Sequence, residues 1–430
     1  MVMILAGVGM IVAFYTDSRL RYPYSVHQAK GFPMNPQAFK RPPRWWSPKL
    51  NWFWWRLWRL FRRRIQFKVQ RLNEIEIRGL EHLRGALSHD FGILITPNHS
   101  GHADPLILYK TAEGVNRGFY FMAAWQVLAK HKPIDRFILR QHGVFSVDRE
   151  GADMKAFRQA VEILITAHNP LVIFPEGEVY HVNDRITPFR DGPVAIALTA
   201  AKKADRPIAC IPCAIKYQYL TDPTDELCEL MGRLEEQILW RRRDDLSLMD
   251  RIYRFAEGAL ALKELEYLGA TQHGPLPSRI NSLSSGILSA IENRQGIASN
   301  GLLLPERIKA VRRAAIEQIA EPTQEHKRIQ ASRDLDDAFV VAQLFSYPGD
   351  YVSAKPTIER MAETLDKFEE DVFKVPTATI RATRKAVVSF GEPMFAEHAN
   401  DRKTAIHALT GLLEQRVQEL LDRIESPQRT

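Results

Sequence analysis

Residues 97–105 combine turn-forming residues with two side chains that could carry out acid–base chemistry. His99 and Asp104 lie five residues apart in the stretch Pro-Asn-His-Ser-Gly-His-Ala-Asp-Pro. A loop that enters a helix at this point can therefore bring the imidazole against the carboxylate, and an imidazole held in this way is a general base. A structural role fits the same residues, with Asn98 or Ser100 capping a helix and Asp104 in its first turn.

Other unusual polar residues stand directly after predicted strands. Arg149 follows one apolar segment, and Glu176 with Gly177 follows another. In α/β sheets, sites collect at strand ends, so we expect these residues to lie near His99 and Asp104. The strands that the apolar runs predict are residues 74–78, 92–96, 118–122, 143–148, 170–174 and 208–215.

Helical spacing between these strands, as at residues 151–167 and 192–202, predicts an α/β fold. We expect a mixed, largely parallel sheet flanked by helices, because strands that alternate with helices build that layered architecture. A strand returns at 385–390. An amphipathic helix at 401–424 should pack on the sheet.

Composition indicates a globular protein. The 430 residues are 45% hydrophobic and 26% charged, which excludes a disordered or fully membrane-embedded chain. Three cysteines in so long a chain argue against a disulfide framework. Cys210 and Cys213 form a C-x-x-C inside an apolar strand, where positions three apart face opposite sides. We expect two core residues there and no metal site.

The N-terminal region differs from the rest in charge and aromatic content. Between Asp17 and Glu74 there are 14 Lys and Arg and no acidic residue, and six of the eight tryptophans lie within residues 45–58. On a helical wheel, Arg56, Arg59 and Arg63 lie roughly opposite an apolar face. That predicted face consists of Trp54, Leu57, Trp58, Phe61, Ile65 and Val69. The pattern favours an in-plane helix on an anionic membrane surface.

Two alternatives remain open for this region. Interleaved arginine and aromatic residues also suit single-stranded nucleic acid, and a docking helix could bury the tryptophans in the core. We expect a membrane surface with anionic lipids as the partner and no nucleic acid, which places the protein peripherally or monotopically on a cytoplasmic membrane face. Residues 1–15 are apolar but too short for a clear spanning helix, and fit a shallow anchor or a buried helix.

Four segments in order resemble the glycerolipid acyltransferase family, which includes glycerol-3-phosphate and lysophosphatidic acid acyltransferases. They are Asn98-His99 with Asp104, Gly-Val-Phe-Ser-Val-Asp-Arg at 143–149, Phe-Pro-Glu-Gly at 174–177 with Pro-Phe-Arg-Asp-Gly at 188–192, and the apolar strand with Pro212. The resemblance covers about residues 72–220 and resumes at 385–394.

This resemblance implies transfer of a fatty acyl group from acyl-CoA or acyl carrier protein to a hydroxyl of a glycerol phosphate or lysophospholipid acceptor. His99 would be the base and Asp104 its orienting partner. Arg149 would bind the acceptor phosphate, unless it only forms a surface ion pair with a neighbouring acidic residue. No cofactor or metal is expected, because a thiolate is already a good leaving group. The implied substrate-binding residues are Arg149, Glu176, Gly177 and Arg190, the last with the weakest support.

The chain departs from the family pattern after Gly177. Glu178 and Val179 stand where the family commonly has Thr or Ser and then Arg, so one phosphate-binding cation is missing. An acceptor without phosphate is therefore an alternative, and so is a non-catalytic lipid-binding or scaffold protein. Gly101 replaces a common Ser. His102 is interpreted as a variable residue at the helix entry.

Four regions are predicted: a basic, Trp-rich membrane-associating segment at 1–71, the acyltransferase body at 72–220, a helical insertion at 221–380, and a return strand with the C-terminal helix at 381–430. The insertion is charge-rich with helical spacing at 224–240, 246–268, 279–294, 305–319 and 356–373. It could cover an acyl groove, present a partner surface, or brace the sheet.

Overall fold

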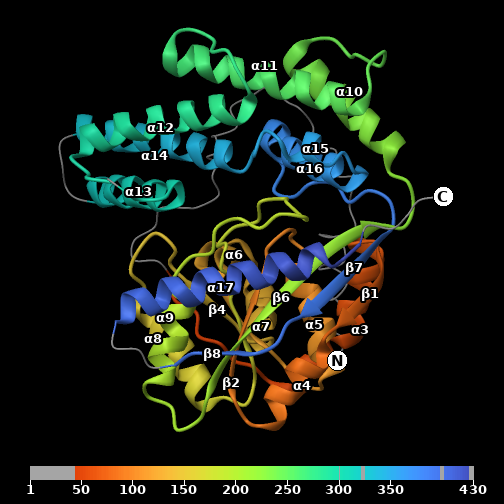
Figure 1. Cartoon of the computed structure of the whole chain (residues 1–430), viewed down its shortest axis with the longest axis vertical. Coiled ribbons are helices and arrows are strands. Elements are labelled where there is room, and N and C mark those ends of the chain that lie inside the picture. The colour runs from red at the N-terminus through yellow and green to blue at the C-terminus, as the bar shows by residue number, and fades with distance from the viewer. Residues whose placement is uncertain (1–43, 300, 321–324, 398–400, 426–430) are drawn as a thin grey trace.

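The computed structural model describes residues 44–299, 301–320, 325–397 and 401–425 (Figure 1). The predicted apolar segment 1–15 lies outside the described residues. One sheet organises the lower half of the molecule, in the order β1-β7-β6-β2-β5-β3-β4, with β8 also paired to β6. The strands are β1 Leu72–Arg78, β2 Gly92–Pro97, β3 Tyr120–Ala124, β4 Val144–Val147, β5 Leu171–Val172, β6 Ile208–Tyr219, β7 Arg384–Phe390 and β8 Met394–Phe395.

The pairing confirms the mixed, largely parallel sheet. β6, β2, β5, β3 and β4 run parallel, with Leu94 of β2 opposite Cys210 on one side and Leu171 on the other. β7 pairs antiparallel to β6 and parallel to β1, and β8 is antiparallel to β6. β2 is buried along its whole length, as its unbroken apolar sequence predicts for a central strand.

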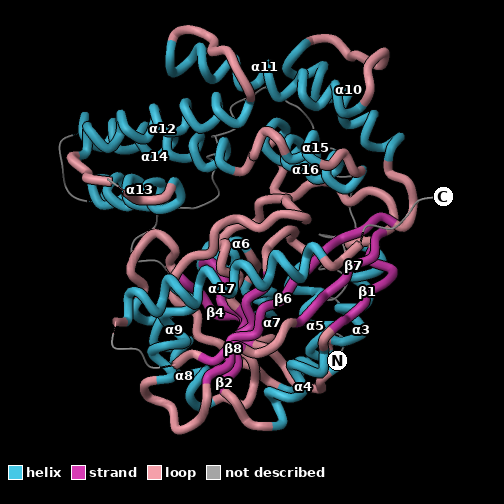
Figure 2. Tube along the Cα trace, viewed as in Figure 1, coloured by secondary structure: helices cyan, strands magenta, loops and turns pink. Residues whose placement is uncertain are grey.

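Helices cover both faces of this sheet and create two cores (Figure 2). Cys213 lies in the core on one face of the sheet and Cys210 in the core on the other face, which confirms that the two cysteines point in opposite directions. Two groups of helices cover these faces. The first group is α4 Leu80–Ser88, α5 Asp104–Gly114, α6 Trp125–Lys130 and α7 Pro133–Gln141. The second is α8 Met154–Thr166, α9 Gly192–Ala201 and α17 Arg402–Asp422.

The chain between β6 and β7 forms a separate helical layer above the sheet (Figures 1 and 2). Its first and last residues lie side by side, because the Leu220 amide donates to the Thr383 carbonyl at 2.7 Å. Two large apolar clusters and a smaller one between α13 and α14 fill its interior. The helices are α10 Thr224–Leu239, α11 Leu248–Leu268, α12 Leu276–Gln295, α13 Leu304–Ala320, α14 Glu325–Phe345, α15 Tyr351–Ala354 and α16 Ile358–Phe373.

The basic, Trp-rich segment packs on the body, but through a different face from the apolar one that the helical wheel predicted. It is divided into α2 Trp52–Leu57, α3 Arg59–Arg64 and a π-helical turn at Ile65–Val69. Its buried residues are Trp55, Arg62 and Gln66, none of which belongs to the predicted apolar face. These three residues still share one face at regular helical spacing, so the pitch is not the cause. The wheel was oriented by apolar residue type, whereas two of the buried side chains are polar: Arg62 donates to Glu113 and Gln66 donates to the Leu72 carbonyl. Among the described residues, no helix combines the length and apolar character needed to cross a bilayer.

Candidate active site

The structure brings His99 and Asp104 together where β2 ends and α5 begins. Nδ1 of His99 lies 2.8 Å from Oδ2 of Asp104. The Asp104 side chain is fully buried, whereas His99 remains 17% exposed. Because Nδ1 is engaged by the carboxylate, Nε2 is the nitrogen left to accept a proton. The ring of His99 also stacks on Phe174, with 4.0 Å between the ring centroids.

The capping role considered for Asn98 and Ser100 is wrong. Helix α5 begins at Asp104 after Ala103, without a capping side chain. Asn98 is buried and instead exchanges two hydrogen bonds with the backbone of Ile215, at 3.0 and 2.7 Å. This pairing fixes the start of the His99 loop against β6. Asp104 does occupy the first turn of the helix, so its two predicted roles coexist.

Three donors hold the carboxylate of Asp104. Oδ2 accepts from the Gly101 amide at 3.0 Å as well as from His99, and Oδ1 accepts from the Tyr217 hydroxyl at 2.5 Å. Burial, followed by the charge of Asp104, raises the pKa of Tyr217 well above its ordinary value, so the phenol stays a donor. Sequence reasoning missed Tyr217 because the predicted strand ended at Ile215, two residues before it.

Glu176 supports the His99 loop from the neighbouring strand end. Its Oε1 accepts the backbone N–H of His99 at 2.7 Å, and its Oε2 accepts from the amide and hydroxyl of Thr187. Burial raises the pKa of Glu176 to about 7. The carboxyl group is thus occupied by protein donors, and its contribution is to position the backbone beneath the base.

Two guanidinium groups approach Gly177. Arg149 Nη1 donates to the Gly177 carbonyl at 2.5 Å and lies 3.3 Å from Glu178. Gly177 has a left-handed φ of +84°, and a Cβ there would lie 2.6 Å from Arg190 Nε. Only glycine permits both this backbone conformation and this close approach. Arg149 does form an ion pair, but with Glu178, which follows Gly177, and not with the adjacent acidic residues Asp148 and Glu150 that the alternative named.

Two lysines extend this positive region. Lys130 is exposed, but crowding by neighbouring atoms and then the charge on Arg149 lower its pKa. Lys309, on helix α13 of the insertion, reaches solvent, but crowding by neighbouring atoms and the charge on Arg190 lower its pKa. Arg312 of helix α13 lies 2.8 Å from Glu150 and so holds this helix against the loop that carries Arg149. Sequence reasoning missed Lys309 because it belongs to a distant part of the chain.

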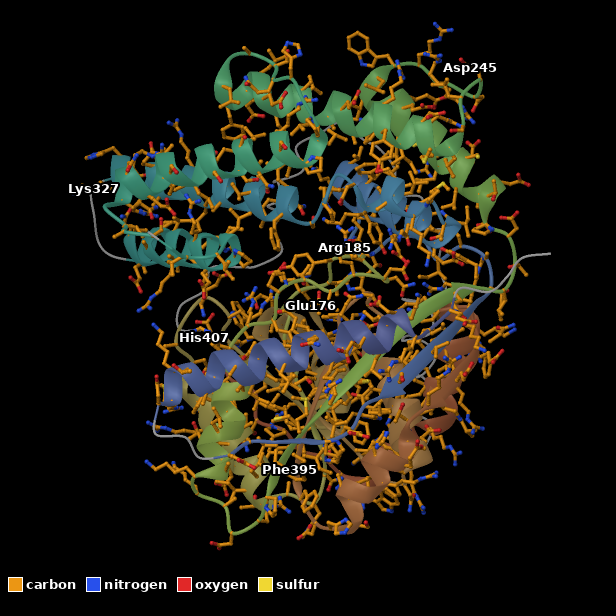
Figure 3. The ribbon with its side chains drawn as sticks, viewed as in Figure 1. Glu176, Arg185, Asp245, Lys327, Phe395 and His407 are labelled. Atoms are coloured by element: carbon orange, nitrogen blue, oxygen red, sulfur yellow. The ribbon has the colours of Figure 1, made fainter. Side chains whose placement is uncertain are left out.

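The loop that follows Gly177 joins the body to the helical layer. Figure 3 shows Glu176 and Arg185 between helix α17 and that layer. Arg185 pairs with Asp350 at 3.0 Å, and Asp184 pairs with Arg360 of α16 at 2.9 Å. The backbone amide of Asn183 donates to the Tyr351 hydroxyl at 3.0 Å. The insertion therefore contacts the same loop that carries the candidate substrate-binding turn.

Comparison with known proteins agrees with the geometry. A sequence model of the family described as Acyltransferase matches residues 74–216. A glycerol-3-phosphate acyltransferase from Pseudoalteromonas atlantica is 27% identical over 176 residues, which cover 37% of this chain and 20% of that protein. The chain thus spans about a fifth of the length of this curated relative. With the order of the four motifs, these matches show that residues 74–216 are similar to the glycerolipid acyltransferases.

Proposed function

We propose that this protein transfers a fatty acyl group from an acyl thioester to a hydroxyl of a glycerolipid precursor. The observation that carries the proposal is the His99 imidazole, bound to buried Asp104 and adjoining a turn with two guanidinium groups. Nε2 of His99 removes the hydroxyl proton while the acceptor oxygen bonds to the acyl carbonyl carbon. When the C–S bond breaks, the imidazolium returns this proton to the thiolate. Asp104 stabilises the imidazolium in between.

The cations around Gly177 support a phosphate on the acceptor. Arg149 and Arg190 would bind its oxygens through charge-assisted hydrogen bonds. Lys309 of the insertion would compensate for the cation that is missing at Val179. Glu178 lies 3.3 Å from Arg149 and neutralises part of this charge, which favours the second candidate, an acyltransferase for a phosphate-free lipid. The donor would be acyl-CoA or acyl carrier protein.

Replacing Arg149 with glutamine tests the acceptor. We expect the KM for glycerol 3-phosphate or lysophosphatidate to rise about 10- to 100-fold, since a hydrogen bond to a charged group contributes roughly 1.5–3 kcal/mol. The KM for monoacylglycerol should not change. Initial rates with acyl-CoA and with acyl carrier protein would establish the donor in the same assay.

The matched control is Arg158→Gln, which changes an exposed arginine of α8. It should leave every KM within about twofold of the wild-type value, as surface substitutions usually do. Monoacylglycerol as the best acceptor, or an equal effect of Arg149→Gln on all acceptors, would select the phosphate-free alternative. Binding of lipid without any transfer would support the scaffold protein.

We further propose that α2, α3 and the π turn rest on an anionic membrane surface. The face opposite Trp55 exposes Phe53, Leu57, Leu60 and Phe67, at 65%, 53%, 76% and 46%. Exposed basic residues alternate with them, namely Arg56, Arg59, Arg64 and Lys68. Apolar side chains inserted between headgroups, with cations beside anionic lipid, are the features of an interfacial helix. Docking on the body and membrane contact thus use different faces of the segment.

The double substitution Leu57→Asp and Leu60→Asp tests this membrane contact. Affinity for vesicles of phosphatidylcholine and phosphatidylglycerol should fall at least about 100-fold, because each buried leucine contributes roughly 1.5–3 kcal/mol. Sedimentation with vesicles measures the loss. The matched control is Leu262→Asp with Leu265→Asp, two exposed leucines on α11 at 54% and 49%. If the first double variant sediments like wild type, the membrane contact lies elsewhere.

A further inference from the structure

Two histidines and a glutamate from three distant parts of the chain meet beside the active site. His102 belongs to the loop before α5, His181 to the loop after β5, and Glu370 to α16 of the insertion. His102 Nε2 lies 3.4 Å from Oε1 of Glu370, and His181 Nε2 lies 3.0 Å from Oε2. These ligand atoms all lie within 4.8 Å of one another.

The three side chains are held in fixed positions, and the cluster they form is open to solvent on one side. The His181 side chain is 10% exposed, and its backbone has a left-handed φ of +53°, a conformation uncommon for residues other than glycine. The carboxylate of Glu370 is oriented by the Ala378 amide, which donates to Oε1 at 2.9 Å. The His102 side chain is 44% exposed and opens the cluster to entering ions.

We propose that His102, His181 and Glu370 bind a divalent zinc ion. Zinc takes imidazole nitrogens and carboxylate oxygens at about 2.0–2.2 Å in a tetrahedron, which separates its ligand atoms by about 3.3 Å. His102 and His181 contact different oxygens of Glu370, at 3.4 and 3.0 Å, and each distance is close to this separation. The three ligand atoms, which lie within 4.8 Å of one another, would close around the ion as the carboxylate turns one oxygen toward both nitrogens. A water molecule would complete the tetrahedron. Two imidazoles disfavour magnesium and calcium, which prefer oxygen ligands.

The metal would fasten the insertion to the active-site loop. His102 lies between Gly101, whose amide binds Asp104, and Asp104 itself. A zinc ion would thus connect this loop to the loop of His181 and to α16. The inference does not depend on the proposed acyl transfer and assigns the metal no part in that chemistry. Residue spacing gives no signal for this site, because positions 102, 181 and 370 lie far apart along the chain.

Zinc titration of the metal-free, full-length protein tests the proposal. Calorimetry and elemental analysis after gel filtration should find one tightly bound zinc per chain in wild type and none with magnesium alone. His102→Ala, Glu370→Gln and His181→Asn should each weaken binding at least about 100-fold, because even the loss of a residue that only orients a metal ligand costs roughly 10- to 100-fold. Asparagine is chosen for position 181 because it tolerates the left-handed backbone.

His407→Ala is the matched control, since His407 is 57% exposed and also lies beside a carboxylate, 3.2 Å from Asp191. It should bind zinc like wild type. Zinc should raise the Tm of wild type and of this control by several degrees, and leave His102→Ala unchanged. If wild type binds no more zinc than His102→Ala and Glu370→Gln, the three residues form only a hydrogen-bonded contact and the proposal fails.

Discussion

Replacing His99 with glutamine should lower kcat at least about 10³-fold, because general base catalysis contributes roughly 10²–10⁴-fold and the base is removed entirely. Glutamine is the informative substitution because it is similar in size, can rest on Phe174, and can still donate to Asp104. Its amide nitrogen cannot take a proton from an alcohol. The assay is acyl transfer from acyl-CoA to lysophosphatidate at saturating acceptor, with Tm measured in parallel.

The control for this experiment is His168→Gln, which removes an exposed histidine that also lies beside a carboxylate, 2.6 Å from Asp90. Its kcat should stay within about twofold of wild type, because surface substitutions of this kind change little. A His99→Gln enzyme that keeps wild-type kcat would refute the role of His99. A large fall in Tm that accompanies the loss of activity would instead show that the loop had lost its structure.

The proximity of His99 and Asp104 could be predicted because both residues lie at one short loop. Only six residues separate strand β2 from helix α5, which leaves few conformations, and the residue types restrict them further. Contacts that support the pair could not be predicted in this way. Tyr217 lies 113 positions from Asp104 and Glu176 lies 77 positions from His99, so only the sheet order brings them together.

Periodicity predicted the core strands and most helices, and failed where its assumptions did not hold. Helix α14 was missed because its buried residues include Asp334 beside Ala331 and Ala338, so no continuous apolar face marks it. The amphipathic helix predicted at 401–424 is present, and its buried residues Leu413, Val417 and Leu421 recur at helical spacing. Strand β6 extends to Tyr219 because β7 pairs with its polar end, a partner far away in sequence.

Asp104→Asn should lower kcat by about 10²–10³-fold while the fold is preserved. The asparagine carbonyl would take the position of Oδ2, because two donors, the Gly101 amide and His99 Nδ1, point at that atom. The amide nitrogen would then face the Tyr217 hydroxyl, which can accept a hydrogen bond. The tautomer of His99 would survive, and only the negative charge that stabilises the imidazolium would be lost.

Tyr217→Phe tests the hydrogen bond to Asp104 without removing the charge of Asp104. The variant keeps the carboxylate and removes one of its donors, so kcat should fall only about 2- to 10-fold. Stability should fall by roughly 1–3 kcal/mol, the cost of a lost partner for a buried polar group. Thermal unfolding and initial rates measured on both single variants provide the comparison.

The double variant Asp104→Asn with Tyr217→Phe decides which way the asparagine turns. Without the phenol, the amide nitrogen loses its acceptor, and the Gly101 amide is then the main group that opposes a turn of this nitrogen toward His99. After such a turn, His99 would be held in the wrong tautomer, which costs about 10⁴-fold in a Ser-His-Asp triad. A loss greater than the product of the two single effects would show that Tyr217 positions the dyad through Asp104. If Asp104→Asn kept wild-type activity, the proposed role of Asp104 in catalysis would be refuted, and only its structural role in the first turn of α5 would remain.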